Sequence, residues 1–237
     1  MTPSARAWFV NALTFARVPL IFLWLGFAVA QEYHPGGALG VCLAVVACAM
    51  MFLSGLTDAL DGAYARKWNV VSTLGKMSDP LMDKVFYIVA FPALTWQVMH
   101  QGESEAHGLV MMSFTILYML RDTWVTFMRM VGTLYGADVA AAWLGKVRTA
   151  LSFPGAGWIY LYCCAHRLAP ASWQRPWLAT CFVVEGLLIV LTLWSLYTYT
   201  LAYGPYLRRA MLADSKGCNE IFLHRSRSDA DDLPQIP

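Results

Sequence analysis

The chain carries little charge for its length. Asp, Glu, Lys and Arg make up 14% of its 237 residues, whereas 58% are hydrophobic and the mean hydropathy is +0.50. Soluble globular domains carry about 25% charged residues. The deficit excludes an ordinary soluble domain and indicates a membrane protein.

The cysteines lack the spacing of a metal site or a redox motif. The sequence contains six cysteines but no C-x-x-C pair and no zinc-type Cys/His spacing, which argues against zinc-finger and thioredoxin-like chemistry. Five of them lie in apolar segments, where a free cysteine behaves as a small hydrophobic residue. We expect them to be packing residues, with a disulfide pair as the alternative. A repeat at a fixed period is also missing, which argues against a solenoid.

Long apolar runs account for most of the chain. A membrane-spanning helix needs about 20 predominantly apolar residues. Runs of about this length occur at residues 12–30, 38–57, 84–100, 108–131, 149–166 and 178–203. We therefore expect an all-α integral membrane bundle of about six transmembrane helices. The first run contains Arg17 and Pro19 and lacks a small-residue cleavage site, so we expect a retained span rather than a signal peptide.

The two ends of the chain are expected to differ from these spans. Residues 3–10 predict a short N-terminal interfacial helix anchored by Trp8 and Phe9. Gly204 and Pro205 are expected to end the last helix. We thus expect a membrane domain over residues 1–213 and a polar, flexible cytoplasmic tail over 214–237.

The basic residues are distributed unevenly between the two sides of such a bundle. Only Arg167 and Arg175, of 17 Lys and Arg, fall in the loops near 31–37, 100–107 and 166–177. The other loops and both ends of the chain hold the rest. Because Lys and Arg accumulate on the cytoplasmic side, we expect both termini and the region 58–83 to face the cytoplasm, in the cell's inner membrane.

Four aspartates are the only acidic residues between Glu32 and Glu103. They lie in two segments, Asp58-Ala-Leu-Asp61-Gly62-Ala-Tyr-Ala65-Arg66 and Gly75-Lys-Met-Ser-Asp79-Pro-Leu-Met-Asp83. If one helix continues through the first segment and the next begins near the second, spacings of three and four place each acid pair on one face. The turn over 68–74 then lets the two faces meet. Ionisable residues this close to a bilayer predict a functional site.

Converging carboxylates repel one another unless cations neutralise them. Carboxylate oxygens suit hard ions such as Mg²⁺ or Mn²⁺ rather than zinc. Two such ions would neutralise a diphosphate and stabilise the attacking and leaving oxygens. We therefore expect two Mg²⁺ or Mn²⁺ ions per active site. Gly62 leaves space for a ligand, and Arg66 offers a planar phosphate donor. The alternative is a solvated loop end whose acids pair with Arg66, Lys67 and Lys84.

The pattern D-x-x-D-G-x-x-A-R-x₈-G-x₃-D-x₃-D, matched at all eight positions, resembles that of the CDP-alcohol phosphotransferase family. The resemblance implies six membrane helices, a homodimer, a di-metal site and displacement of CMP from a CDP-linked lipid by an alcohol. It implies that the metals are held by Asp58, Asp61, Asp79 and Asp83. It makes Asp83 the base for the acceptor hydroxyl. It assigns CDP-diacylglycerol binding to Asp58, Gly62, Ala65, Arg66 and Gly75.

Other segments resemble the phosphatidylglycerophosphate synthase branch of this family. They are Gly75-Lys-x-x-Asp79-Pro-x-x-Asp83-Lys84, Asn11-x-Leu-Thr14-x-x-Arg17, Arg121-Asp122-x₆-Arg129 and Ala137-x₇-Gly145-Lys146-x-Arg148-Thr149. This branch implies CDP-diacylglycerol and glycerol 3-phosphate as substrates. We expect the acceptor phosphate to bind Arg121, Lys146 and Arg148, although each cation could instead anchor anionic headgroups. Three positions depart from the family's usual residues: Asp122 for Glu, Ser78 for Leu and Arg148 for Lys.

Several other readings stay open at this point. Within the family, a cardiolipin synthase would use phosphatidylglycerol as the acceptor, and other members use inositol phosphate or serine. An intramembrane prenyltransferase also binds a diphosphate through aspartates and Mg²⁺, but it needs more helices and two separated motifs. An ion transporter would carry acids near span midpoints in both halves of the chain. Glu185, inside the last span, is expected to pair with Arg175 or Arg167 rather than to belong to the site.

Overall fold

The computed structural model describes residues 2–70, 73–101, 104–136, 143–166 and 170–212. Within these residues the regular structure is entirely helical. The helices are α1 (Pro3–Tyr33), α2 (Gly37–Trp68), α3 (Thr73–Gln101), α4 (Glu105–Leu134), α5 (Trp143–Ala165) and α6 (Ala171–Leu212). Each of the six apolar runs falls on one helix, which confirms the predicted all-α bundle. The predicted tail over 214–237 lies outside the described residues.

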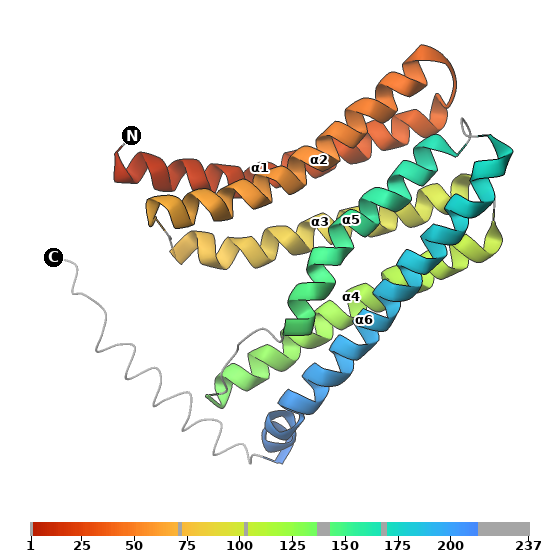
Figure 1. The fold of residues 1–237 in the computed structure, drawn as a ribbon. Coiled ribbons are helices and arrows are strands. Elements are labelled where there is room, and N and C mark those ends of the chain that lie inside the picture. Colours follow the sequence, from red (N-terminus) through yellow and green to blue (C-terminus); the bar gives the residue numbers. More distant parts are fainter. Residues whose placement is uncertain (1, 71–72, 102–103, 137–142, 167–169, 213–237) are drawn as a thin grey trace.

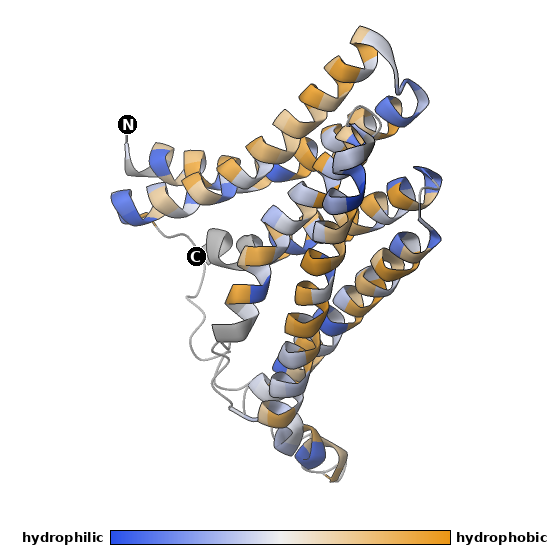
Figure 2. Ribbon diagram, turned by 45° about the vertical axis from the view of Figure 1, so that its right-hand side comes forward, coloured by the Kyte–Doolittle hydropathy of each residue, from blue (hydrophilic) through white to orange (hydrophobic). Residues whose placement is uncertain are grey.

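In the part of the chain that the structure describes, three helices are long and apolar enough to cross a membrane by length and composition: Ala5–Tyr33, Gly37–Trp68 and Ser172–Leu212. Figure 2 shows hydrophobic residues along much of the length of the helices, interrupted by hydrophilic ones. The other helices, α3, α4 and α5, contribute many of the polar side chains of the site described below. The chain is therefore a helical membrane protein.

Successive helices run in alternating directions. The start of α1, the end of α2, the start of α5 and the end of α6 lie toward one side of the molecule, and the ends of α1, α3 and α5 lie on the opposite side (Figure 1). Helix α1 packs on α2 and α3, α4 packs on α3 and α6, and α5 contacts α2, α3 and α6. This alternation places the two aspartate segments at the same end of the bundle as the arginines of α4 and α5.

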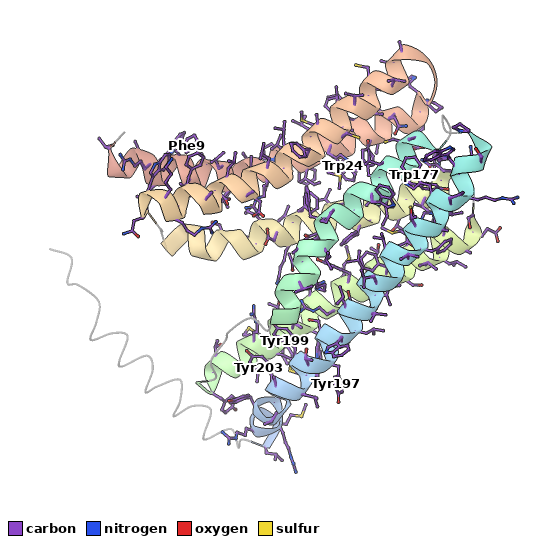
Figure 3. The ribbon with its side chains drawn as sticks, viewed as in Figure 1. Phe9, Trp24, Trp177, Tyr197, Tyr199 and Tyr203 are labelled. Atoms are coloured by element: carbon purple, nitrogen blue, oxygen red, sulfur yellow. The ribbon has the colours of Figure 1, made fainter. Side chains whose placement is uncertain are left out.

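A belt of aromatic side chains forms the centre of the bundle. Trp24 of α1 meets Tyr160 of α5 edge to face, with ring centroids 5.3 Å apart. Phe91 of α3 meets Phe114 of α4 at 4.8 Å. These residues are fully buried, and Figure 3 shows Trp24 on the side of α1 that faces the rest of the bundle. Since lipid is as apolar as these rings, close packing holds membrane helices together.

The helix ends differ from the sequence predictions at two places. Residues 3–10 are the first turns of a continuous α1, capped by Thr2 Oγ1, which accepts from Ala5 N at 3.3 Å. The prediction that Gly204 and Pro205 end the last helix is wrong, because α6 continues to Leu212. A proline inside a helix removes one hydrogen bond. Tyrosines on both sides of the proline pack against α4, and the last turns of α6 are turned aside from the rest of the helix (Figure 1).

The turn after α2 follows the prediction. Helix α2 passes Arg66 and ends at Trp68, and α3 begins at Thr73. Asn69 adopts the left-handed conformation (φ 52°), which asparagine tolerates at a helix end. Its N–H donates to the carbonyl of Arg66, and Val70 N donates to the carbonyl of Ala65. This tight cap returns the chain, and α3 then packs on α1, so that its aspartates reach those of α2 at the Arg17 side chain.

Candidate active site

The aspartates of α2 and α3 meet around the guanidinium of Arg17, which comes from α1. Arg17 Nη2 donates to Asp61 Oδ2 at 2.8 Å and contacts Asp58 Oδ1, while Nη1 donates to Asp83 Oδ1 at 2.7 Å. The Arg17 side chain is 4% exposed. The predicted convergence of the two acid pairs is thus observed for three of the four residues. The side chain of Asp79 lies outside the described residues.

Helix α1 supplies a second hydrogen-bond donor to the Asp61 carboxylate. Thr14, one turn before Arg17, donates its hydroxyl to Asp61 Oδ2 at 2.8 Å. Sequence reasoning missed this contribution of α1 to the acid cluster. A signal was nevertheless present, because Arg17 is an isolated basic residue inside an apolar run, and its spacing of three from Thr14 places both on one helical face.

The three described carboxylates differ in their access to solvent. The side chain of Asp61 is 5% exposed, whereas those of Asp58 and Asp83 are 56% and 41% exposed. Asp61 is therefore an internal anchor that binds α1, and the other two present oxygens to the surroundings. Asp61 is thus suited to stabilising the site, whereas Asp58 and Asp83 are suited to contacting a substrate.

Asp58 and Asp83 line a cavity of about 630 Å³ that also contains cationic side chains from α4. The cations are Arg121 and Arg129, and Tyr199 of α6 lines the cavity with them. The remaining lining residues are Arg17, Ser54, Gly55, Phe86, Tyr87, Val125, Gly145, Thr149, Ala150, Phe153 and Pro154. One space thus connects the acidic cluster to a basic one.

A neighbouring cavity of about 330 Å³ extends the basic region. Asp83, Arg121 and Arg129 line both cavities, while Arg148 and Asp122 line only this second one. Asp83 therefore lies at the junction, between the other aspartates and all three arginines. No other carboxylate among the described residues lines both spaces.

Asp122 holds two of the arginines together. Its Oδ1 accepts from Arg121 Nη1 at 2.8 Å and from Arg148 Nη2 at 2.6 Å. The Arg148 guanidinium also lies over the Tyr118 ring, 4.0 Å from its centroid. Both arginines are buried, and one carboxylate neutralises only one of the two charges. The cluster therefore keeps a net positive charge, and Asp122 joins α4 to α5.

Helix α6 contributes to the same region, which sequence reasoning did not find. Ser195 Oγ accepts a hydrogen bond from Arg121 Nη2. The Tyr199 ring lies 5.2 Å from Arg121 Cζ and 5.6 Å from Arg129 Cζ. Neither residue belongs to a sequence motif, and only the packing of α6 on α4 brings them to the cavity.

The predicted nucleotide-lipid residues of α2 lie next to the acidic cluster. Gly62 and Ala65 are half-buried near the end of α2, and Arg66 is exposed. A side chain on Gly62 would begin 3.3 Å from Arg66 Nη1, so the guanidinium lies against the glycine. None of these three is among the residues that line the larger cavity.

Gly75 on α3 and Lys146 on α5 are also predicted site residues, but their side-chain environments lie outside what the structure describes. Their predicted roles therefore stay predictions. The same holds for Asp79.

The donor set of the acidic cluster fits an oxygen-ligated divalent cation. Carboxylates from two helices reach one small group, the Arg17 guanidinium, and hard ions prefer such oxygens. Within the described residues no three acidic, histidine or cysteine side chains are grouped closely enough to hold a metal by themselves. Instead, the carboxylates of Asp58, Asp61 and Asp83 each contact the Arg17 guanidinium. A cation bound here would therefore share or take over carboxylates that Arg17 contacts.

The predicted pairing of Glu185 with Arg175 or Arg167 is wrong for Arg175, and Arg167 lies outside the described residues. Glu185 is fully buried, and its Oε1 lies 2.8 Å from His107 Nε2 of α4. Because α6 already begins at Ala171, Arg175 is on the same helix, about 15 Å along the axis from Glu185. The buried pair ties α4 to α6 at the end of the bundle opposite the aspartates.

Comparisons with known proteins place these residues in context. Residues 8–194 match the profile of the family described as CDP-alcohol phosphatidyltransferase. The cardiolipin synthase (CMP-forming) of Streptomyces coelicolor is 27% identical over 188 residues, covering 74% of this chain and 80% of that protein. The CDP-diacylglycerol–glycerol-3-phosphate 3-phosphatidyltransferase of Treponema pallidum is 29% identical over 180 residues (75% and 78%). The protein of that name from Escherichia coli K12 is 30% identical over 190 residues (79% and 90%).

Proposed function

The chain belongs to the CDP-alcohol phosphatidyltransferase family, and we propose that it transfers the phosphatidyl group of CDP-diacylglycerol to sn-glycerol 3-phosphate, releasing CMP. One observation carries the choice of acceptor: a single cavity is lined by Asp58 and Asp83 and also by Arg121 and Arg129. An alcohol that bears a phosphate monoester would find cations in the same space as the reacting carboxylates.

The acidic cluster is the proposed site of the donor's diphosphate. Divalent cations, Mg²⁺ or Mn²⁺, would be held by Asp58, Asp61, Asp79 and Asp83. When bound, they would neutralise the diphosphate and stabilise charge on the departing CMP. The nucleotide part of the lipid would lie against Gly62, Ala65 and Gly75, with Arg66 as a planar donor to a phosphate oxygen.

Asp83 is the proposed general base. Its side chain is 41% exposed and lies at the junction of the two cavities, so an acceptor hydroxyl can approach it. Asp83 would take the hydroxyl proton while the hydroxyl oxygen bonds to the phosphatidyl phosphorus and the bond to the CMP oxygen breaks. Asp61 is unsuited to this step, because it is buried and accepts from Thr14 and Arg17.

The basic cluster is the proposed site of the acceptor's phosphate. Arg121, Lys146 and Arg148 would bind its oxygens. Hydrogen bonds from guanidinium groups to phosphate are charge-assisted and often bidentate, which orients the ligand as well as binding it. Asp122 holds two of these guanidiniums in place before the phosphate binds, so less side-chain conformational entropy is lost on binding.

A second candidate is a cardiolipin synthase, because one relative carries that name. Its acceptor, phosphatidylglycerol, presents a phosphodiester with one negative charge on a lipid. The buried arginine cluster favours the more highly charged and smaller glycerol 3-phosphate. The two candidates share every step at the aspartates and differ only in the acceptor.

The enzyme is proposed to act as a homodimer in the inner membrane, with its active site and both termini facing the cytoplasm. The uneven distribution of Lys and Arg supports this orientation. Glycerol 3-phosphate would reach the site directly from that side.

An acceptor screen tests the proposal. Purified protein would be incubated with CDP-diacylglycerol, Mg²⁺ and one acceptor at a time, and CMP release would be measured. Glycerol 3-phosphate is expected to support turnover, and glycerol, serine, inositol phosphate and phosphatidylglycerol are expected to support little. A preference for phosphatidylglycerol would establish the second candidate instead.

A further inference from the structure

The last part of α6 reaches the active site although it lies beyond residues 8–194, which the family profile matches. Ser195, Tyr199 and Tyr203 follow one another at intervals of four and so share one face of the helix. All three are buried, with exposed fractions of 0%, 3% and 6%. Tyr197, between them in sequence, is 64% exposed and points away from Tyr199 in Figure 3.

The Tyr199 ring lies beside two of the cavity's cations. Its centroid is 5.2 Å from Arg121 Cζ and 5.6 Å from Arg129 Cζ, and all three residues line the larger cavity. A guanidinium within about 6 Å of an aromatic ring centroid is attracted by the ring's negative face. One ring thus contacts two like-charged side chains that would otherwise repel each other.

The ring has little freedom to move. A side chain on Gly145 of α5 would begin 3.2 Å from Tyr199 Oη and 3.4 Å from Arg121 Nη2, so both groups lie against the α5 backbone. On the other side, Tyr203 lies parallel to Tyr199, with centroids 6.1 Å apart and planes 7° apart. Ser195 also accepts from Arg121. The face of α6 is therefore a fixed wall of the basic region.

We propose that Tyr199 is a positioning residue of the acceptor site, whose ring holds the Arg121 and Arg129 guanidiniums in place for the phosphate of the acceptor. This inference rests on the proposed function, since it assigns a role toward the same acceptor. It makes the preference for a phosphorylated alcohol depend on α6 as well as on α4 and α5. The cations that the ring contacts are Arg121 and Arg129 of the basic region, so binding of the nucleotide lipid at the aspartates is expected to be independent of it.

Two substitutions distinguish the contribution of the Tyr199 ring from that of its hydroxyl. Tyr199→Leu removes the aromatic face, and the KM for glycerol 3-phosphate is expected to rise about 10- to 30-fold, as two lost cation–π contacts imply. The KM for CDP-diacylglycerol is expected to stay within about twofold, the range of an uncoupled site. Tyr199→Phe keeps the face and is expected to retain a nearly normal acceptor KM. Tyr197→Leu, on the exposed side of the same helix, is the matched control.

A third variant covers the case in which Tyr199→Leu does not fold. A trifluorinated phenylalanine at position 199 keeps the shape of the ring but weakens its negative face. Its acceptor KM is expected to exceed that of Tyr199→Phe by at least about threefold. An unchanged KM in this variant would overturn the proposal, because the ring would then act only by filling space.

The outcomes also distinguish this inference from the proposed function. If the wild-type protein releases no CMP with glycerol 3-phosphate, the proposed function fails before any variant is measured. If the wild type is active and Tyr199→Leu has a normal acceptor KM, only the role of Tyr199 fails. Equal rises in the KM of both substrates would also reject it, since they would indicate general damage to the site.

Discussion

Arg17 joins Asp61 to Asp83, and in doing so connects three helices through one guanidinium. Nη2 donates to Asp61 of α2 at 2.8 Å, and Nη1 donates to Asp83 of α3 at 2.7 Å. With Asp58 in contact as well, three negative charges surround one positive charge. The cluster is held together and still carries the excess negative charge that a divalent cation would neutralise.

Replacing Arg17 by Gln is therefore expected to destabilise the protein and to change its response to metal. Breaking a buried ion pair costs about 3–5 kcal/mol, so the melting temperature in detergent should fall. Mg²⁺ should raise the melting temperature of Arg17→Gln more than that of the wild type, because the carboxylates then lack their internal cation. Arg17→Lys, which keeps the charge, is the control. Equal Mg²⁺ shifts in all three proteins would contradict a shared site for Arg17 and metal.

Removal of divalent metal is expected to abolish turnover. The proposed reaction depends on neutralising a diphosphate next to a cluster that is already negative. CMP release should stop in excess chelator and return when either Mg²⁺ or Mn²⁺ is added back. Full activity in the chelator would reject metal dependence.

Substitutions of Asp83 and Asp61 are expected to impair the enzyme in different ways. Asp83→Asn removes the base but leaves the other carboxylates, so turnover should drop at least about 100-fold, the usual contribution of a general base, while CDP-diacylglycerol still binds. Asp61→Asn removes the anchor of Arg17 and should weaken binding of the nucleotide lipid and lower stability. Direct binding of CDP-diacylglycerol and CMP release, measured side by side, distinguish these results. Near-normal turnover in Asp83→Asn would show that another group is the base.

The basic cluster is expected to serve the acceptor alone. A hydrogen bond to a charged group contributes about 1.5–3 kcal/mol, so Arg121→Ala, Lys146→Ala and Arg148→Ala should each raise the KM for glycerol 3-phosphate about 10- to 100-fold. The KM for CDP-diacylglycerol should change little. Arg209→Ala, an exposed arginine at the end of α6, is the control for loss of charge. A rise in the CDP-diacylglycerol KM instead would assign these cations to the donor.

The His107–Glu185 pair is expected to act on stability only. His107→Ala leaves the Glu185 carboxyl buried without its 2.8 Å partner, and an unsatisfied buried polar group costs about 1–3 kcal/mol. The melting temperature should fall, and the double variant His107→Ala/Glu185→Leu should recover much of the loss, because it removes both polar groups. Both substrate KM values should stay normal in the double variant. A selective change in one KM would show that this end of the bundle communicates with the site.

The sequence predicted what depends on local spacing. Intervals of three and four residues put Asp58 with Asp61 on one face, and apolar run lengths gave the six helices. It did not predict features that arise when distant helices pack. Arg17 lies 44 residues before Asp61, and no spacing rule connects residues so far apart.

Two errors have the same physical origin. Sequence proximity predicts an arginine partner for Glu185, but its partner His107 lies 78 residues earlier and meets it because α4 packs on α6. Proline lacks an N–H, which predicts a helix end at Pro205, yet α6 continues to Leu212, and residues on both sides of the proline pack against α4. Tyr199 belonged to no motif, and its position beside Arg121 depends on the same α4–α6 contact.

The arginine in α1 also bears on how the chain enters the membrane. Synthesis proceeds from the N-terminus, so Arg17 reaches the bilayer before Asp61, 44 residues later, has been made. An isolated span with a central arginine costs about 2.5–3.5 kcal/mol on insertion scales, and an unpaired aspartate in the next span costs a similar amount. Neither α1 nor α2 is therefore well suited to settle in lipid alone. The two are expected to insert together as a hairpin, with Arg17, the counter-ion of the buried Asp61 carboxylate, guiding the first step of biogenesis.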